Sequence, residues 1–164
     1  MYLMIILGID PGTHRTGFAV IEKERSRISL LECGLISPKT QEQRQRILII
    51  WQKTEELIEK YKPNYIAIEK IFFSQNKKTA LAVAEVRGIF LLKSAMQGAE
   101  LLEFSPNEVK LTICGYGHAS KSQVLNIVLK TLKIDKIDGP DDVSDAVAIA
   151  LTGAFRTRSL MAKN

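Results

Sequence analysis

Carboxylates stand at the ends of the most apolar segments of this chain. Asp10 closes the first apolar run, Glu69 closes a later one, and Asp142 and Asp145 open the apolar pattern of the last predicted helix. An ionised carboxylate at the end of a buried strand loses its hydration, which is costly unless a cation compensates. Three such places in one chain predict a shared compensator, and a divalent metal ion is the simplest one.

The length of 164 residues predicts one domain with a sizeable core. We place that domain at 1–155 and expect a basic, flexible tail at 156–164. The hydrophobic fraction of 46% is typical of a soluble globular protein, and the net charge of +5 is a weak indication of an anionic partner.

Cysteine spacing and hydropathy indicate the compartment. Cys33 and Cys114 are far apart and lack Cys-x-x-Cys spacing, so we interpret them as reduced core thiols of a cytoplasmic protein. The first apolar run is too short to span a membrane and lacks the basic region of a secretory signal. We therefore expect no membrane association.

Apolar periodicity and turn residues predict an α/β fold. The predicted strands are 4–10, 16–21, 28–36, 65–69 and 100–104. The predicted helices are 41–60, 79–96, a short one after Ser105, 120–132 and 141–155. Short polar connections make the first three strands antiparallel, and the later alternation favours a mixed five-stranded sheet flanked by helices.

The helix at 79–96 is apolar nearly all round. Such a helix is buried on more than one side. It is either the core helix of a monomer or a helix that faces both a core and a partner subunit.

The acids form a site if the strands that end in Asp10 and Glu69 are neighbours in the sheet. Asp142 and Asp145 are three residues apart and share one face of a helix. Two Mg²⁺ or Mn²⁺ ions roughly 4 Å apart would activate a water and stabilise the leaving 3′ oxygen in phosphodiester hydrolysis. Each acid alone has an ordinary explanation in a turn, a helix N-terminus or the surface, but their joint occurrence favours the site.

Basic and aromatic residues suit a nucleic-acid partner. The candidate phosphate contacts are Arg15, Lys77, Lys78, Lys110 and Lys121, although any one of them could be a solvated surface residue. Phe72 and Phe73 lie in a polar segment, where one could belong to the core and the other stack on unpaired bases.

Six segments, in order along nearly the whole chain, carry a resemblance to a known family. They are Gly8-Ile9-Asp10-Pro11-Gly12-Thr13, Ile68-Glu69-Lys70-Ile71-Phe72-Phe73, Arg87-Gly88, Pro106-Asn107-Glu108-Val109-Lys110, Gly115-Tyr116-Gly117 and Asp142-Val143-Ser144-Asp145-Ala146. With these spacings the chain resembles RuvC, the bacterial Holliday junction resolvases.

The resemblance implies a ribonuclease-H-like fold and a homodimer that binds a four-way DNA junction. Such a dimer cuts two strands symmetrically in recombination and repair, with two Mg²⁺ per subunit (Mn²⁺ can substitute) and a branch-migration motor complex as partner. Asp10, Glu69, Asp142 and Asp145 match the catalytic, metal-binding acids. Asp141 is adjacent, but the spacing to Asp145 selects Asp142.

The resemblance also implies DNA contacts and an interface. Phe72 matches the aromatic that stacks into the junction, with Phe73 as its adjacent alternative. Lys110 and Lys121 match basic residues implicated in DNA contact or catalysis, and Asn76, Lys77 and Lys78 are further candidates for DNA contact. The helix at 79–96 matches the dimer helix.

Three other functions remain as alternatives. A related ribonuclease-H-like nuclease acting on RNA–DNA hybrid or other branched DNA would share the fold and the acids. An actin-like or sugar-kinase-like ATPase half would also place Asp-x-Gly-Thr on its first strand, but it needs a second, similar domain and a longer chain. A non-catalytic DNA-binding module is disfavoured, since four acids near DNA repel phosphates unless metals bridge them.

Overall fold

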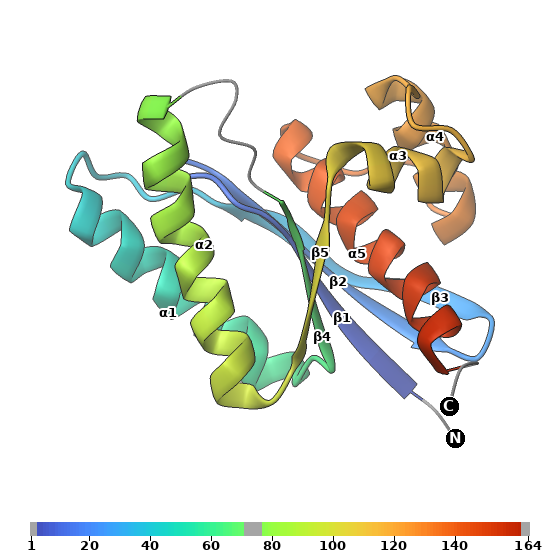
Figure 1. The fold of residues 1–164 in the computed structure, drawn as a ribbon, viewed down its shortest axis with the longest axis horizontal. Coiled ribbons are helices and arrows are strands. Elements are labelled where there is room, and N and C mark those ends of the chain that lie inside the picture. Colours follow the sequence, from blue (N-terminus) through green and yellow to red (C-terminus); the bar gives the residue numbers. More distant parts are fainter. Residues whose placement is uncertain (1–2, 71–76, 162–164) are drawn as a thin grey trace.

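The computed structural model describes residues 3–70 and 77–161 (Figure 1). Its strands are β1 (Leu3–Asp10), β2 (Thr16–Glu24), β3 (Arg27–Ile36), β4 (Tyr65–Glu69) and β5 (Glu100–Phe104). Its helices are α1 (Gln43–Tyr61), α2 (Lys77–Gln97), α3 (Pro106–Cys114), α4 (Lys121–Leu132) and α5 (Asp141–Met161).

The five strands form one mixed sheet in the order β3-β2-β1-β4-β5. β2 pairs antiparallel with both β1 and β3, while β4 pairs parallel with both β1 and β5. The predicted mixed sheet with three antiparallel first strands is therefore confirmed. The parallel β1–β4 pair brings two carboxyl ends of strands to the same edge.

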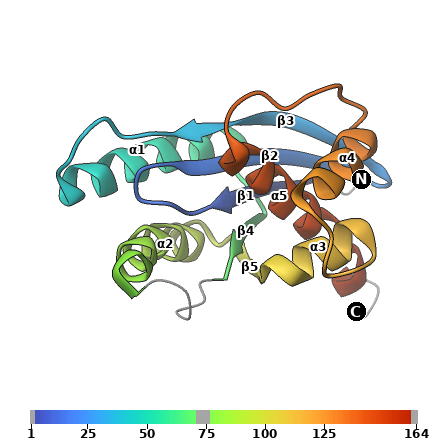
Figure 2. The same ribbon diagram turned by 90° about the horizontal axis from the view of Figure 1, so that it is seen from above.

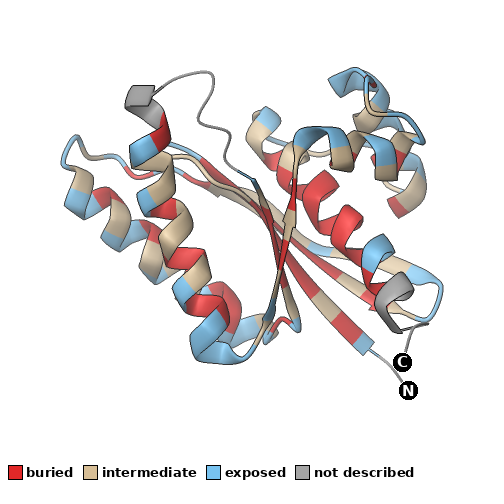
Figure 3. Ribbon diagram, viewed as in Figure 1, coloured by how far each residue is buried: buried red, intermediate tan, exposed pale blue. Residues whose placement is uncertain are grey.

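Helices cover both faces of the sheet. α1 and α2 lie on one face, and α5 with α3 and α4 lies on the other (Figure 1; Figure 2). Successive side chains of a strand point to opposite faces. Accordingly, Ile6 packs in the core under α5, and Leu7 packs in the second core against α1 and α2. The central strands and much of α5 are buried (Figure 3).

α5 packs so closely on the sheet that two glycines beneath it have no room for a side chain. A Cβ atom at Gly8 would lie 2.5 Å from the Ala146 carbonyl oxygen, and one at Gly17 would lie 1.9 Å from the Asp142 carbonyl oxygen. Side chains at these two places would push the helix away. The glycines therefore set the start of α5 directly against the ends of β1 and β2.

The last helix is longer than the sequence pattern predicts. It was expected to end at 155, with a tail from Arg156, but α5 continues to Met161. Thr157 is fully buried, and the buried side chain of Lys23 donates a hydrogen bond to the Ala154 carbonyl oxygen. These tertiary contacts stabilise a helical end whose polar sequence resembles a loose tail.

The second helix begins earlier than the sequence predicts. It was expected at 79–96, but Lys77 and Lys78 already belong to α2. The candidates Phe72, Phe73 and Asn76 lie outside the described residues. Across the part of the chain that is described, no helix combines the length and apolarity that a membrane crossing requires.

Candidate active site

Asp10 and Glu69 lie side by side at the carboxyl edge of the sheet. Ile9 of β1 is in register with Ile68 of β4, so the residue that follows each strand partner is an acid. Lys70, the next residue, donates its backbone N–H to the carbonyl oxygen of Phe104 and ends β4 in a fixed position. The prediction that the strands ending in these two acids are neighbours is confirmed.

α5 adds two more carboxylates to this edge. Asp10 is in register with Gly17, and the backbone of Asp142 packs on Gly17. Asp145 lies one turn further along α5 and lines the same hollow as Glu69. The structure thus brings together the four acids singled out from the sequence, while their catalytic role stays a prediction.

Burial and mutual repulsion disfavour the charged form of the strand acids. Burial is the main cause that raises the pKa of Asp10 from 3.8 to about 7, and the charges of Glu69, Asp145 and Asp142 raise it further. Burial, then Asp145, also raises the pKa of Glu69, while a side-chain hydrogen bond with Asp10 opposes that shift. The charge of Lys121 lowers the pKa of both acids but does not offset these effects.

The helix acids have cationic partners. Arg15 Nε lies 3.5 Å from Asp142 Oδ2. Lys121 Nζ lies 2.8 Å from Asp145 Oδ2 and 3.5 Å from Asp141 Oδ2. The side chain of Asp141 is 79% exposed and that of Asp142 only 22%, which favours Asp142 as the member of the acid cluster.

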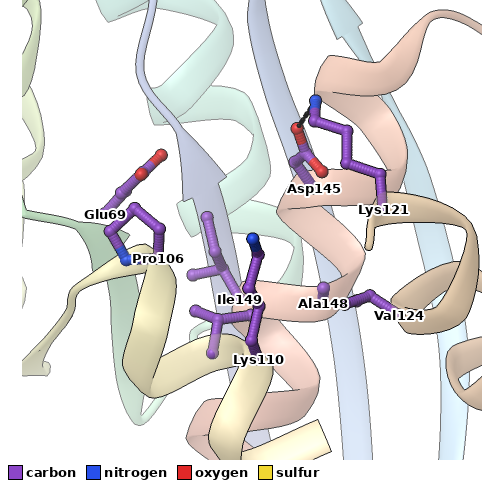
Figure 4. A pocket seen from close by; sticks show the side chains of 9 residues that line it. Glu69, Pro106, Lys110, Lys121, Val124, Asp145, Ala148 and Ile149 are labelled. Carbon is purple, nitrogen blue, oxygen red and sulfur yellow. Dashed lines mark hydrogen bonds and ion pairs between the residues drawn. The ribbon is translucent and has the colours of Figure 1, made fainter. Parts of the chain in front are cut away.

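The four acids offer the donor set that a hard divalent cation prefers, since all their ligand atoms are carboxylate oxygens. Asp10 and Glu69 are desolvated, and the charge of Lys121 does not offset the rise in their pKa values, which also fits a site that a metal ion completes. Within residues 3–70 and 77–161, however, no three His, Cys, Asp or Glu side chains converge closely enough to hold an ion as they stand. Asp145 is turned toward Lys121 (Figure 4).

A hollow of about 350 Å³ opens beside the acids. Its charged lining consists of Glu69, Asp145, Lys110 and Lys121, so both predicted lysines border the acid site (Figure 4). The remaining lining is apolar and comes from Pro106, Val109, Val124, Ala148 and Ile149.

Capping fixes the two helices that carry the lysines. Ser105 accepts a hydrogen bond from the backbone N–H of Glu108, and Ser120 accepts one from that of Gln123, in two capping boxes. The sequence correctly placed Ser105 as a helix cap. It did not predict that Lys70 would pair with Glu108 at 3.5 Å, which links the end of β4 to α3.

Sequence reasoning also missed the partner of Arg15. This residue was a candidate phosphate contact, but nothing in the sequence linked it with Asp142. Two polar residues so far apart in the chain give no periodic signal, and only the packing of α5 on Gly17 brings them together. The side chains of Lys77 and Lys78 are outside the described part of the molecule.

Nearly the whole chain is similar to known proteins of one family. The family model of crossover junction endodeoxyribonuclease RuvC matches residues 6–153. The crossover junction endodeoxyribonuclease RuvC of Brachyspira hyodysenteriae is 46% identical over 156 residues, which cover 94% of this chain and 96% of the relative.

Solved structures agree with the sequence match. The structure of Thermus thermophilus RuvC in complex with a Holliday junction substrate superposes with a TM-score of 0.88 at 30% identity, covering 95% of this chain and 96% of that one. The yeast mitochondrial Holliday junction resolvase has the same fold, with a TM-score of 0.67 at 17% identity over 94% of this chain and 78% of that one. The predicted ribonuclease-H-like fold is confirmed, and the chain belongs to the RuvC family of crossover junction endodeoxyribonucleases.

Proposed function

We propose that this protein is an endodeoxyribonuclease that resolves four-way DNA junctions in recombination and repair. The observation that carries the proposal is the gathering of Asp10, Glu69, Asp142 and Asp145 at one sheet edge in a chain of the RuvC family. The similar Thermus thermophilus protein was solved with a Holliday junction.

The acids are proposed as the catalytic and metal-binding residues. The RuvC family consists of metal-dependent nucleases, and we assign Mg²⁺ as the ion, two per subunit, with Mn²⁺ as a substitute. When bound, these ions would stabilise charge on the phosphate and make water a stronger nucleophile. Asp10 and Glu69 would hold them from the strand ends, and Asp142 and Asp145 from the helix.

The basic and aromatic residues are proposed to bind DNA. Lys110 and Lys121 border the acids, where ammonium groups attract a phosphate that the carboxylates alone would repel. Earlier in the chain, the proposed DNA contacts are Phe72 or Phe73, which would stack on an unpaired base, and Asn76, Lys77 and Lys78.

The proposed homodimer is supported by the outer face of α2. Leu81, Leu92 and Met96 are 68%, 52% and 61% exposed. They share this face with Gly88, where an added Cβ would meet nothing within 4 Å among the described residues other than the adjoining backbone of its own helix. Such an apolar stripe is unfavourable in water and suits a second copy of the helix. A branch-migration motor complex is a further proposed partner, on the family resemblance.

Cleavage of a labelled synthetic four-way junction with Mg²⁺ tests the proposed activity, with linear duplex and RNA–DNA hybrid as control substrates. We expect paired symmetric nicks in the junction alone. Asp10→Asn should slow cleavage at least about a thousandfold and leave junction binding intact, because metal ions supply several kcal/mol of transition-state stabilisation.

The matched control is Asp135→Asn, which removes an exposed carboxylate elsewhere and should cut like the wild type. Near wild-type cleavage by Asp10→Asn would refute the site. Cleavage of the hybrid instead of the junction would move the function to another ribonuclease-H-like nuclease, and tight binding without any cleavage would indicate a binding module.

The dimer is tested by sedimentation equilibrium. Leu92→Glu would place a charge in the middle of the apolar stripe on α2 and should shift the protein to monomers at micromolar concentration. Leu31→Glu adds the same charge at an exposed site on β3 and should leave the dimer intact. A monomeric wild type, or a dimer that tolerates Leu92→Glu, would contradict the proposed interface.

A further inference from the structure

Arg15 occupies the turn between β1 and β2, directly beside the acid cluster. Its side chain is 56% exposed, and its Nε lies 3.5 Å from Asp142 Oδ2. Neither the family match nor the names of the relatives assign a role to this residue. The guanidinium must find another partner when Asp142 binds a divalent cation.

The backbone that carries Arg15 is fixed independently of this ion pair. Thr16 is fully buried, and its hydroxyl donates to the Gly12 carbonyl oxygen at 2.6 Å. The same hydroxyl accepts a hydrogen bond from the Gly12 backbone N–H at 3.4 Å. The turn therefore keeps its shape whether or not the Arg15 side chain contacts Asp142.

The ion pair itself is weak. Charge-assisted N–H···O bonds are about 2.7–2.9 Å long and, for arginine, often bidentate. The Arg15–Asp142 contact is longer, uses Nε alone, and involves a half-exposed side chain. By comparison, Lys121 contacts Asp145 at 2.8 Å. A pair of this kind neutralises the carboxylate without holding it strongly.

Asp142 nevertheless needs a positive neighbour. Its side chain is only 22% exposed, and it lies in a cluster whose members repel one another. A divalent cation among the acids would neutralise Asp142 more fully than the guanidinium at 3.5 Å does. It would also repel that guanidinium. The released side chain would then face the anionic backbone of DNA from a fixed turn, and arginine presents a fork of donors that matches a phosphate.

We propose that Arg15 is a positioning residue that exchanges partners: it neutralises Asp142 in the cation-free protein and binds a DNA phosphate once a divalent cation holds that carboxylate. This inference rests on the proposed function, because it needs both the cation and the DNA. It makes two separate demands, one on cation affinity without DNA and one on the salt dependence of DNA binding.

The first demand is tested by calorimetric titration of Mn²⁺ into the cation-free protein without DNA. Arg15→Gln removes the competitor for Asp142, so it should bind Mn²⁺ up to about fivefold more tightly than the wild type. Arg15→Lys keeps the charge and should stay near the wild type. Arg27→Gln, at the opposite end of the sheet, removes a charge remote from the acids and should change nothing.

The second demand is tested by junction binding over a salt series in Ca²⁺. Arg15→Gln should bind more weakly, and the slope of log K against log salt should fall by about 0.9 per subunit, as expected for one lost phosphate contact. Arg15→Lys should restore most of that slope. A residue that only shaped the turn would alter neither slope nor Mn²⁺ affinity in this charge-dependent way.

Each outcome decides a named part of the proposal. Unchanged Mn²⁺ affinity in Arg15→Gln would overturn the competition for Asp142, and an unchanged slope would overturn the phosphate contact. If the wild type binds Mn²⁺ and cuts the junction while Arg15→Gln matches Arg27→Gln, only this inference fails. A wild type that binds no Mn²⁺ or cuts no junction would overturn the proposed function as well.

Discussion

The strand-end acids and the helix acids reach the same site with opposite electrostatic surroundings. Asp10 and Glu69 are desolvated and have raised pKa values, and no ion pair from the described residues reaches either of them. Asp142 and Asp145 sit at the start of α5 with Arg15 at 3.5 Å and Lys121 at 2.8 Å. The strand pair feels only the longer-range charge of Lys121, whereas each helix acid has a cation in direct contact.

This difference indicates how the site divides its tasks. A metal ion should stabilise most strongly the carboxylates that have no ion-pair partner. The strand acids should therefore contribute most of the free energy of metal binding. The helix acids must give up existing partners before they can serve as ligands, so they should adjust the affinity. Solvent-exposed ion pairs contribute little free energy, so the helix acids lose little when they exchange a side-chain partner for a metal ion.

The largest effect should come from separating the two pairs of acids. Gly17→Ala would place a methyl group 1.9 Å from the Asp142 carbonyl oxygen, so the start of α5 or the start of β2 must shift. We expect a loss of about 3 kcal/mol in the free energy of unfolding, measured with urea, together with loss of junction cleavage.

The control for that change is Gly117→Ala, whose added methyl group would meet nothing closer than 3.8 Å. It should unfold at nearly the wild-type urea concentration. If Gly17→Ala were equally stable and active, the close seat of α5 would not be what holds the acids together.

A smaller effect should appear in the pH dependence of stability without metal. Asp10 has a pKa of about 7 in the folded protein against 3.8 as the ordinary value, so the folded state binds its proton more tightly than the unfolded chain does. Stability should therefore fall as the pH rises from about 4 to about 7, and the raised pKa of Glu69 acts in the same direction.

Asp10→Asn removes this penalty. In EDTA at pH 8 the variant should be more stable than the wild type by about 1–2 kcal/mol, and the difference should vanish near pH 4. Asp135→Asn, at an exposed position, should show no such gain. A destabilised Asp10→Asn at pH 8 would mean that Asp10 is not held in an unfavourable charged state. The strand acids would then not differ from the helix acids in the way described above.

The sequence predicted the framework better than the electrostatics. Apolar runs that end in acids predicted the strands β1 and β4, and Ser105 followed by Pro106 predicted the start of α3, because these signals are local. The predicted end of α5 at residue 155 was wrong, because the burial of Thr157 depends on tertiary contacts that the local sequence does not show. The Arg15–Asp142 pair was missed for the same reason, because it exists only after α5 packs on β2.

The smallest effect should come from the helix pair, and it completes the comparison. Asp145 is paired with a largely exposed Lys121 and also repels Asp10 and Glu69, so its removal loses a solvent-screened ion pair but relieves part of that repulsion. In EDTA at pH 8, Asp145→Asn should change the free energy of unfolding by less than about 1 kcal/mol, against the larger gain of Asp10→Asn. Urea unfolding of the two variants side by side measures the difference directly. Equal gains in both variants would mean that repulsion is shared by all four acids, and the helix pair would then need a metal ion as much as the strand pair does.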